Sequence, residues 1–120
     1  ETEASFYIDE EINTVEDAKK YVNQILDLGI KNALITIGEN GVYFANKDTN
    51  HFEPSLDLQN KVVDTSGAGD AFNGAFATAL CEGQSVNEAI KFANCYAGIS
   101  TTRIGTANSM PSREEIDKIL

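Results

Sequence analysis

Tryptophan is absent from this sequence, and Met, His, Pro and Cys are scarce: its 120 residues include one Met, one His, two Pro and two Cys. The two cysteines, Cys81 and Cys95, form no Cys-x-x-Cys pair and have no partner spacing that suggests zinc, so a reducing compartment is the simplest expectation. No apolar run approaches the ~20 residues of a membrane helix, and the start has no signal-peptide pattern. The sequence therefore predicts a cytoplasmic protein without a membrane partner.

Basic residues are also few. Nine Lys and Arg stand against nineteen Asp and Glu, which gives a formal net charge of −10. A surface this acidic argues against broad binding to the phosphate backbone of DNA or RNA. It does not exclude a local anion site built from backbone N–H groups, because such a site needs no net positive charge. With 42% hydrophobic residues, the length fits one domain with a packed core, or part of one.

Hydrophobic periodicity predicts an α/β fold. Apolar residues recur at helical spacing after Thr14, and Gly29 marks the end of that helix. Residues 33–37 are a short, almost continuous apolar run, which is typical of a buried parallel strand. Asn40-Gly41 then predicts a turn, and residues 42–45 the returning strand. Further elements are expected as short strands at 51–53 and 61–63 and as helices at 71–81, from Ser85 and from Pro111, whereas residues 1–13 show no clear periodicity.

Residues 63–75 form the most informative segment, Val-Asp-Thr-Ser-Gly-Ala-Gly-Asp-Ala-Phe-Asn-Gly-Ala. The segment runs from a predicted strand through Gly67-Ala68-Gly69 into a predicted helix. The first turn of a helix has unpaired N–H groups and a partial positive charge, and glycine lets the backbone approach a phosphate closely. A P-loop is excluded because the segment has no Lys, and a dinucleotide fingerprint is excluded because Phe72 occupies the third glycine position.

Asp70 is the unusual residue of this segment. A carboxylate beside an anion site repels phosphate, so its presence there requires a chemical role. The natural role is to accept a proton from the attacking hydroxyl during phosphoryl transfer. The alternative is an ordinary strand-to-helix turn in which Asp70 is a helix cap.

The segment resembles the second signature of the ribokinase-like family of carbohydrate kinases, also called the phosphofructokinase-B-type family. Residues 34–42 are similar to the family's nucleotide strand and turn, and residues 101–111 and 113–116 to its C-terminal loop. The resemblance covers essentially the whole chain and implies an α/β fold, the C-terminal part of a doubly wound, Rossmann-like sheet with flanking helices. Residues 1–120 would be the nucleotide-binding and catalytic C-terminal portion of a longer kinase, whose sugar-binding half and lid lie upstream.

The resemblance implies ATP-dependent phosphorylation of a sugar hydroxyl, with the 5-hydroxyl of ribose as the first expectation. Another sugar or nucleoside kinase of the same family stays open, as does a nucleotide- or anion-binding module without catalysis. A sugar and ATP would be the partners, with no nucleic acid and no membrane, and the longer kinase would be a homodimer. The 120-residue portion is expected to be inactive by itself.

The resemblance also implies roles for individual residues around Asp70. Asp70 would be the catalytic base, and Gly67, Ala68 and Gly69 would donate backbone N–H groups to the transferring phosphoryl group. Glu3 would act through Mg²⁺ and its water shell, as the end of an Asn-x-x-Glu motif whose Asn precedes residue 1; the alternative is a solvated acidic tail.

The nucleotide and a monovalent cation, K⁺, would take further residues. The nucleotide would be bound by Thr36, Ile37, Gly38, Glu39, Asn40, Gly41, Gly69 and Asn94. The cation would be bound by the carboxylate of Asp64, the backbone carbonyls of Ser66, Ser100, Arg103 and Gly105, and the side chain of Ser109. The alternatives are a plain hairpin turn for residues 36–41, a helix-surface Asn94, and an Asp64 that only caps its loop.

Overall fold

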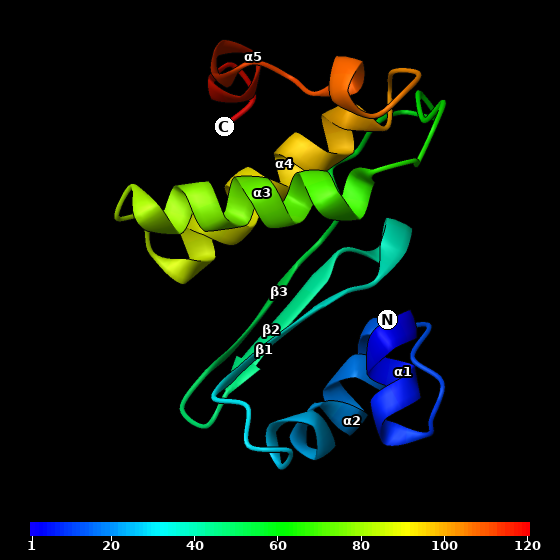
Figure 1. Cartoon of the computed structure of the whole chain (residues 1–120), viewed down its shortest axis with the longest axis vertical. Coiled ribbons are helices and arrows are strands. Elements are labelled where there is room, and N and C mark those ends of the chain that lie inside the picture. Colours follow the sequence, from blue (N-terminus) through cyan, green and yellow to red (C-terminus); the bar gives the residue numbers. More distant parts are fainter. The chain divides into compact units, whose positions relative to one another are not determined.

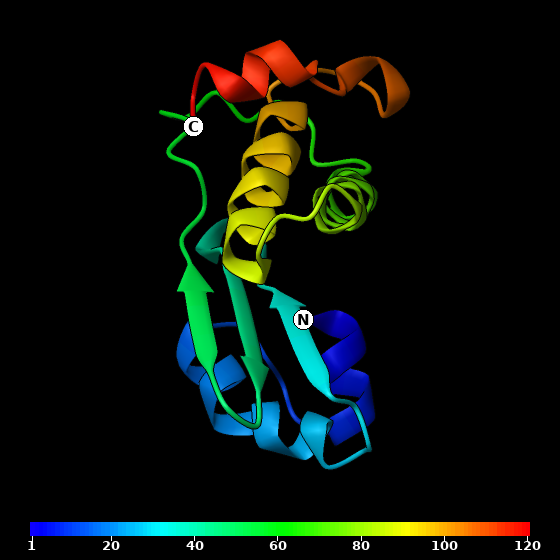
Figure 2. The ribbon, with the colours of Figure 1, turned by 90° about the vertical axis from the view of Figure 1, so that its left-hand side faces the viewer.

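Residues 1–54 form a three-stranded antiparallel sheet with two helices against it, in the computed structural model that describes all of residues 1–120 (Figures 1 and 2). In this unit Leu34 lies opposite Phe44 and Tyr43 opposite Phe52. The elements are α1 (Thr2–Ile8), α2 (Val15–Leu26), β1 (Asn32–Thr36), the 3₁₀ turn η1 (Gly38–Asn40), β2 (Val42–Asn46) and β3 (Asn50–Glu53). The sheet order is β1-β2-β3.

Helix α2 begins where the sequence predicts. The Thr14 hydroxyl accepts a hydrogen bond from the Asp17 N–H, and the Asp17 carboxylate accepts one from the Thr14 N–H, both at 3.1 Å. This reciprocal cap satisfies two of the N–H groups that a helix start leaves unpaired. The buried core between the helix and the sheet is formed by residues of both and by Ile12: Ile12, Ala18, Val22, Ile25, Ala33, Ile35, Ile37, Tyr43 and Ala45.

The expected parallel pairing of residues 33–37 is wrong within this chain. Strand β1 pairs only with β2, and that pairing is antiparallel. The physical reason is the short connection through η1, because a parallel pair needs a crossover of about a dozen or more residues. Strand β1 therefore forms one edge of the three-stranded sheet.

Helix α1 escapes the sequence analysis. It is seven residues long, has no buried residue and no side-chain cap, and ends at Asp9 in the left-handed region (φ 56°). Only Ala4 and Ile8 of this short helix pack against the core, and both are partly buried, so its apolar stripe is too short for hydrophobic periodicity to reveal.

Residues 55–120 form the second compact unit, which is mainly helical. Its elements are α3 (Ala68–Cys81), α4 (Val86–Ser100), the 3₁₀ turn η2 (Ala107–Ser109) and α5 (Arg113–Asp117). Helices α3 and α4 pack side by side (Figure 1). Small residues make this packing close: Ala79, Ala89 and Ala93 are fully buried. None of the helices in either unit is long and apolar enough to cross a membrane.

Three local expectations for residues 55–120 need correction. Residues 61–63 are not a strand. The N–H of Val63 donates to the Thr101 carbonyl (2.8 Å), which follows α4, and not to a neighbouring strand. Helix α3 begins at Ala68, three residues earlier than predicted, because Gly67 already starts the helical bonding. The apolar residues Ile116, Ile119 and Leu120 at the C-terminal end are all expected to pack inward, but Ile119 and Leu120 are exposed and only Ile116 is buried.

Candidate functional site

Gly67 occupies the N-cap position of α3 with φ +75°, in the left-handed region. A Cβ atom at this position would lie 3.1 Å from Cγ2 of Thr106. Glycine is therefore suited to the position twice, by its backbone torsion and by the close approach of Thr106. The contact also places the loop before α3 against the loop after α4.

The first turn of α3 offers unpaired N–H groups. The N–H of Ala71 donates to the Gly67 carbonyl at 2.9 Å, and that of Ala68 donates to the Thr65 carbonyl at 3.2 Å. The N–H groups of Gly69 and Asp70 have no acceptor within the chain. Donors of this kind, together with the helix dipole, favour an anion such as a phosphate.

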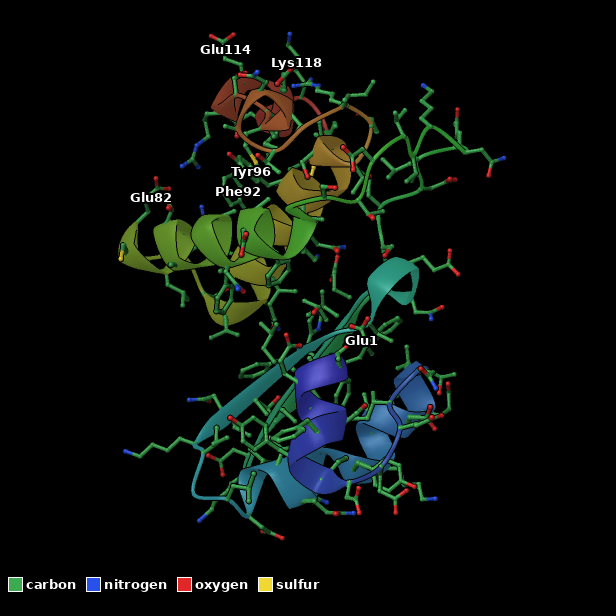
Figure 3. The ribbon with its side chains drawn as sticks, turned by 45° about the vertical axis from the view of Figure 1, so that its right-hand side comes forward. Glu1, Glu82, Phe92, Tyr96, Glu114 and Lys118 are labelled. Carbon is green, nitrogen blue, oxygen red and sulfur yellow. The ribbon has the colours of Figure 1, made fainter.

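Asp70 lies in this first turn with an exposed side chain. The three ion pairs of the chain join His51 to Glu53, Arg103 to Glu115 and Arg113 to Glu82, so none involves Asp70. Asp70 lines a surface groove of about 370 Å³ together with Gly74 and Thr78 of α3, Phe92 and Tyr96 of α4, and Arg113. Figure 3 labels Phe92 and Tyr96 on α4. Its carboxylate is thus open to a substrate hydroxyl and adjacent to unpaired donors, which a proton acceptor in phosphoryl transfer requires.

Arg113 is a groove residue that sequence reasoning missed. Its guanidinium lies 4.6 Å from the centroid of the Phe92 ring, and its Nη2 lies 2.6 Å from Oε1 of Glu82. The stacking on the aromatic face and the ion pair hold a cationic group at the groove that also contains Asp70. Sequence analysis places Arg113 in a predicted helix and in the segment similar to the family's C-terminal loop, but no local pattern links it to α3 or α4.

Asp64 joins two loops through its carboxylate. Oδ1 accepts a hydrogen bond from the Ser66 N–H (2.9 Å), and Oδ2 accepts one from the Gly105 N–H (3.1 Å). The hydrogen bond from the Ser66 side chain, followed by those from the Ser66 and Gly105 N–H groups, lowers the pKa of Asp64 from its ordinary value. The Asp64 carboxylate is therefore negatively charged at neutral pH, which favours a nearby cation.

The loop after α4 is tied to the segment before α3. The Thr101 carbonyl accepts hydrogen bonds from the N–H groups of both Val63 (2.8 Å) and Asp64 (3.0 Å). The Ser100 carbonyl accepts one from the Arg103 N–H at 3.3 Å. Hydrogen bonds thus connect the segment around Asp64 to residues 101 and 105 of this loop. Five of the six residues expected to bind a monovalent cation lie in these two segments: Asp64, Ser66, Ser100, Arg103 and Gly105.

Ser109, the sixth of these residues, lies on η2 and is fully buried. Its hydroxyl donates to the Thr106 carbonyl at 2.6 Å, which leaves the lone pairs of its Oγ as acceptors. Thr106 also lies against Gly67. Thr106 therefore links Ser109 to the start of α3 by contact. The donor set is therefore oxygen-only, as a large hard cation prefers, and the residues present fit K⁺.

Asn94 lies in the middle of α4 and is half-buried. The other residues expected to bind the nucleotide, apart from Gly69, lie in residues 1–54. Thr36 ends β1, the buried Ile37 and the Gly38–Asn40 turn follow, and Gly41 leads into β2. The hairpin turn is closed by the Ile37 N–H, which donates to the Gly41 carbonyl at 2.8 Å.

Glu3 belongs to the same unit as this hairpin turn. It lies in the first turn of α1 with an exposed side chain. The backbone nitrogen of Glu1 donates to the Thr36 carbonyl at 2.9 Å, which brings the start of α1 to the end of β1. No group of three or more His, Cys, Asp or Glu side chains forms a metal cage. A single carboxylate still fits Mg²⁺, which is held by one or two carboxylates together with waters and nucleotide phosphates.

Comparison with known proteins identifies relatives along almost the whole chain. Residues 1–113 match the pfkB family carbohydrate kinases. The ribokinase of Haemophilus influenzae is 38% identical over 96% of this chain and 37% of its own length. The deoxyribokinase of Salmonella typhi is 33% identical over the whole chain and 39% of its own length.

A solved structure agrees with this assignment. The Arabidopsis thaliana ribokinase complexed with ribose and ATP superposes with a TM-score of 0.91 at 32% identity, over 99% of this chain and 38% of that one. The fold is thus that of the ribokinases, as the sequence analysis expects. The chain spans less than two fifths of the length of these relatives. It belongs to the pfkB family of carbohydrate kinases.

Proposed function

We propose that this chain is the C-terminal, nucleotide-binding and catalytic portion of a longer kinase, called the complete kinase below, which phosphorylates ribose at its 5-hydroxyl with ATP. The observation that carries the proposal is the start of α3, where an unpaired Asp70 carboxylate lies beside N–H donors without acceptors. Similarity to ribokinases supports the choice of sugar. The proposal includes a cytoplasmic homodimer as the working form.

In the proposed mechanism Asp70 accepts the proton of the sugar hydroxyl as its oxygen attacks the terminal phosphate of ATP in line. The N–H groups at the start of α3 stabilise the charge that develops on the transferring phosphoryl group. Residues 36–41 and Asn94 hold the nucleotide. Glu3 would hold Mg²⁺ through water, and the oxygens around Asp64 would hold K⁺; these ions would supply positive charge for the transfer.

The acceptor sugar is tested by ADP production in the complete kinase. Under this proposal ribose gives the highest kcat/KM among ribose, 2-deoxyribose, fructose and nucleosides. The similarity to a deoxyribokinase makes 2-deoxyribose the second candidate. A preference for 2-deoxyribose or for a nucleoside would replace ribose as the substrate but would leave the roles proposed for Asp70 and Asp64 unchanged.

The isolated 120-residue chain is expected to show no ribose-dependent ADP release. It spans only 37–39% of the length of its relatives, and the proposal assigns the sugar-binding residues to the remainder. The measurement is a coupled ADP assay with ribose and Mg-ATP, with the complete kinase at equal concentration as the control. Comparable turnover of the two proteins would show that the chain contains the sugar site. The assignment of the sugar-binding residues to the rest of the complete kinase would then be wrong.

Potassium is expected to raise the activity of the complete kinase more than lithium does at the same ionic strength. The proposed ligands of the cation are one carboxylate and oxygen atoms held by backbone bonds. Oxygen atoms held at fixed positions suit a large cation, whereas lithium is too small to reach all of them at once. Initial rates in the two chloride salts at saturating Mg-ATP measure the difference. Equal rates would count against a specific cation site.

A further inference from the structure

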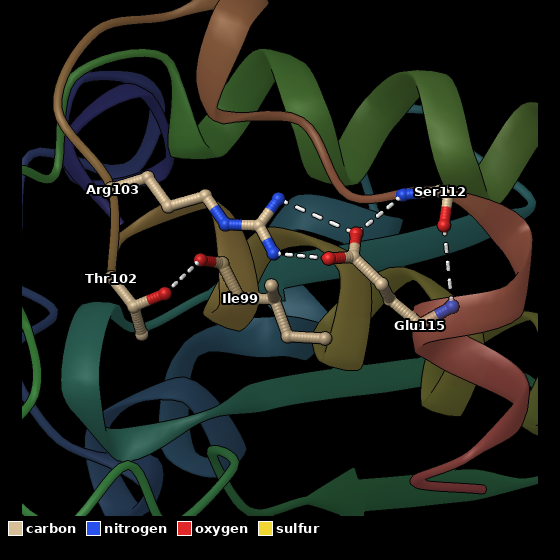
Figure 4. Close-up of polar contacts among 5 residues, drawn as sticks. All are labelled: Ile99, Thr102, Arg103, Ser112 and Glu115. Carbon is tan, nitrogen blue, oxygen red and sulfur yellow. Dashed lines mark hydrogen bonds and ion pairs between the residues drawn. The ribbon is translucent and has the colours of Figure 1, made fainter.

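The loop after α4 is connected to α5 by a two-pronged ion pair between Arg103 and Glu115 (Figure 4). Nη2 of Arg103 lies 2.5 Å from Oε1 of Glu115, and Nη1 lies 3.3 Å from Oε2. The side chains are 38% and 40% exposed. A planar guanidinium that meets both carboxylate oxygens fixes orientation as well as distance, which a single contact to an ammonium does not.

Glu115 is itself fixed by the start of α5. Its Oε2 also accepts the Ser112 N–H at 2.7 Å, and the Ser112 hydroxyl accepts the Glu115 N–H at 3.4 Å. The hydrogen bond from the Arg103 side chain, and after it the one from the Ser112 N–H, lowers the pKa of Glu115. The next residue, Ile116, is fully buried. The carboxylate that meets Arg103 is therefore charged and attached to a helix anchored in the core.

The loop on the other side of the ion pair is held at its two ends, where the Thr101 carbonyl accepts hydrogen bonds from the N–H groups of Val63 and Asp64 and the Gly105 N–H donates to Asp64. None of residues 101–105 is buried, and Ile104, its one large apolar residue, is 79% exposed. The Thr102 hydroxyl bonds back to the Ile99 carbonyl at 2.7 Å, which ends α4 but does not reach another element (Figure 4). Arg103 is the residue of the loop whose side chain reaches α5.

The same loop supplies two of the proposed cation ligands, the carbonyls of Arg103 and Gly105. Loss of the ion pair would leave Arg103 held only by its N–H bond of 3.3 Å to the Ser100 carbonyl. We propose that Glu115 is a positioning residue, which acts through Arg103 to hold the 101–105 loop in the shape that binds the monovalent cation. This role rests on the cation site of the proposed function.

The test compares two single variants of the complete kinase, their double variant and a control. Arg103→Met and Glu115→Gln weaken the ion pair, and Glu115→Gln keeps an oxygen for the Ser112 N–H. Each is expected to raise the potassium concentration for half-maximal activity about fivefold. In Glu115→Gln, kcat at saturating potassium is expected to stay near the wild-type value. The double variant is expected to shift the potassium concentration no further than either single variant, because both remove the same interaction.

Ser112→Ala is the matched control, because it removes the hydroxyl cap of α5 and leaves the Arg103 contact in place. Its half-activating potassium concentration is expected to stay at the wild-type value. An equal shift in Ser112→Ala would assign the effect to helix capping, and an unchanged constant in Arg103→Met would show that the ion pair does not position the loop; either result overturns the proposal. Equal rates of the wild-type enzyme in potassium and lithium would refute the cation site and, with it, this role. A potassium effect in the wild type without a shift in the variants would refute only the role of Glu115.

Discussion

An Asp70→Asn variant of the complete kinase is expected to lose kcat by about 10²- to 10⁴-fold, with a modest change in the KM for ATP. Asparagine has the same shape as aspartate but cannot accept the proton of the sugar hydroxyl. The loss falls on kcat because the interaction exists only in the transition state. Steady-state kinetics with ribose and Mg-ATP measure it.

Folding cannot account for a loss of this size. Asp70 is exposed, and the three ion pairs of the chain do not include it. Its charge at the start of α3 stabilises the helix by only about 0.3–1 kcal/mol. Asp57→Asn is the matched control, since Asp57 is also an exposed aspartate of residues 55–120, and its Oδ1 accepts the Gln59 N–H. Near-normal turnover of Asp70→Asn would remove Asp70 from the catalytic step.

A Gly41→Ala variant is expected to destabilise the hairpin of β1 and β2 by about 3 kcal/mol or more. Gly41 has φ +112° and ψ −147°, a region that is almost exclusive to glycine. A Cβ atom there would lie 2.2 Å from the Glu53 carbonyl oxygen and 3.0 Å from Cα of Pro54. Both neighbours are backbone, so the strand ends must separate. Urea unfolding of the complete kinase measures the loss.

Gly38→Ala in the same turn is the matched control for this prediction. Gly38 has φ +49°, but a Cβ atom there would meet nothing within 4 Å. Its replacement is expected to cost only about 1 kcal/mol, the strain of a left-handed alanine. If the two variants lose equal stability, the close approach of Gly41 to Glu53 is not what requires glycine. The KM for ATP is also expected to rise more in Gly41→Ala, because both glycines belong to the proposed nucleotide turn but only a Cβ atom at Gly41 would clash with backbone and distort it.

Local signals in the sequence predict the elements that carry their own stop and start residues. Helix α2 is found from the Thr14–Asp17 cap and its buried stripe, and β2 from the apolar run after Asn40-Gly41. The start of α3 is mistaken by three residues because Gly67 looks like loop in sequence, whereas its carbonyl already accepts the first helical bond. Strand direction and the short α1 depend on pairing and contacts that no local pattern contains.

In the candidate site, too, features made of consecutive residues can be predicted from the sequence, whereas contacts between distant residues cannot. The Gly67–Asp70 segment is recognisable because the residues that make it are consecutive. The contacts of Asp64 with Gly105 and of Arg103 with Glu115 join residues 41 and 12 positions apart, so no local pattern shows them. The spacing of Ser112 and Glu115 predicts a helix cap, and the structure confirms that cap. Only the structure shows that the same carboxylate also binds Arg103.

Two helix ends of opposite polarity lie at one place in residues 55–120. The N–H bonds of Val63 and Asp64 to Thr101 bring the C-terminus of α4 beside the segment that enters α3. The last turn of α4 has no basic residue to neutralise its partial negative charge. Under the proposed function, the start of α3 is the positive pole for the phosphate and the end of α4 the negative pole for the cation.

Such a field does not depend on the protein's overall charge. Charges on the surface more than about 10 Å away are largely screened at physiological ionic strength. A chain with a formal net charge of −10 can therefore still bind a phosphate at α3. Substitution of distant acidic residues on the surface is therefore expected to leave the backbone part of the site's polarity unchanged, because that part comes from the direction of two helices.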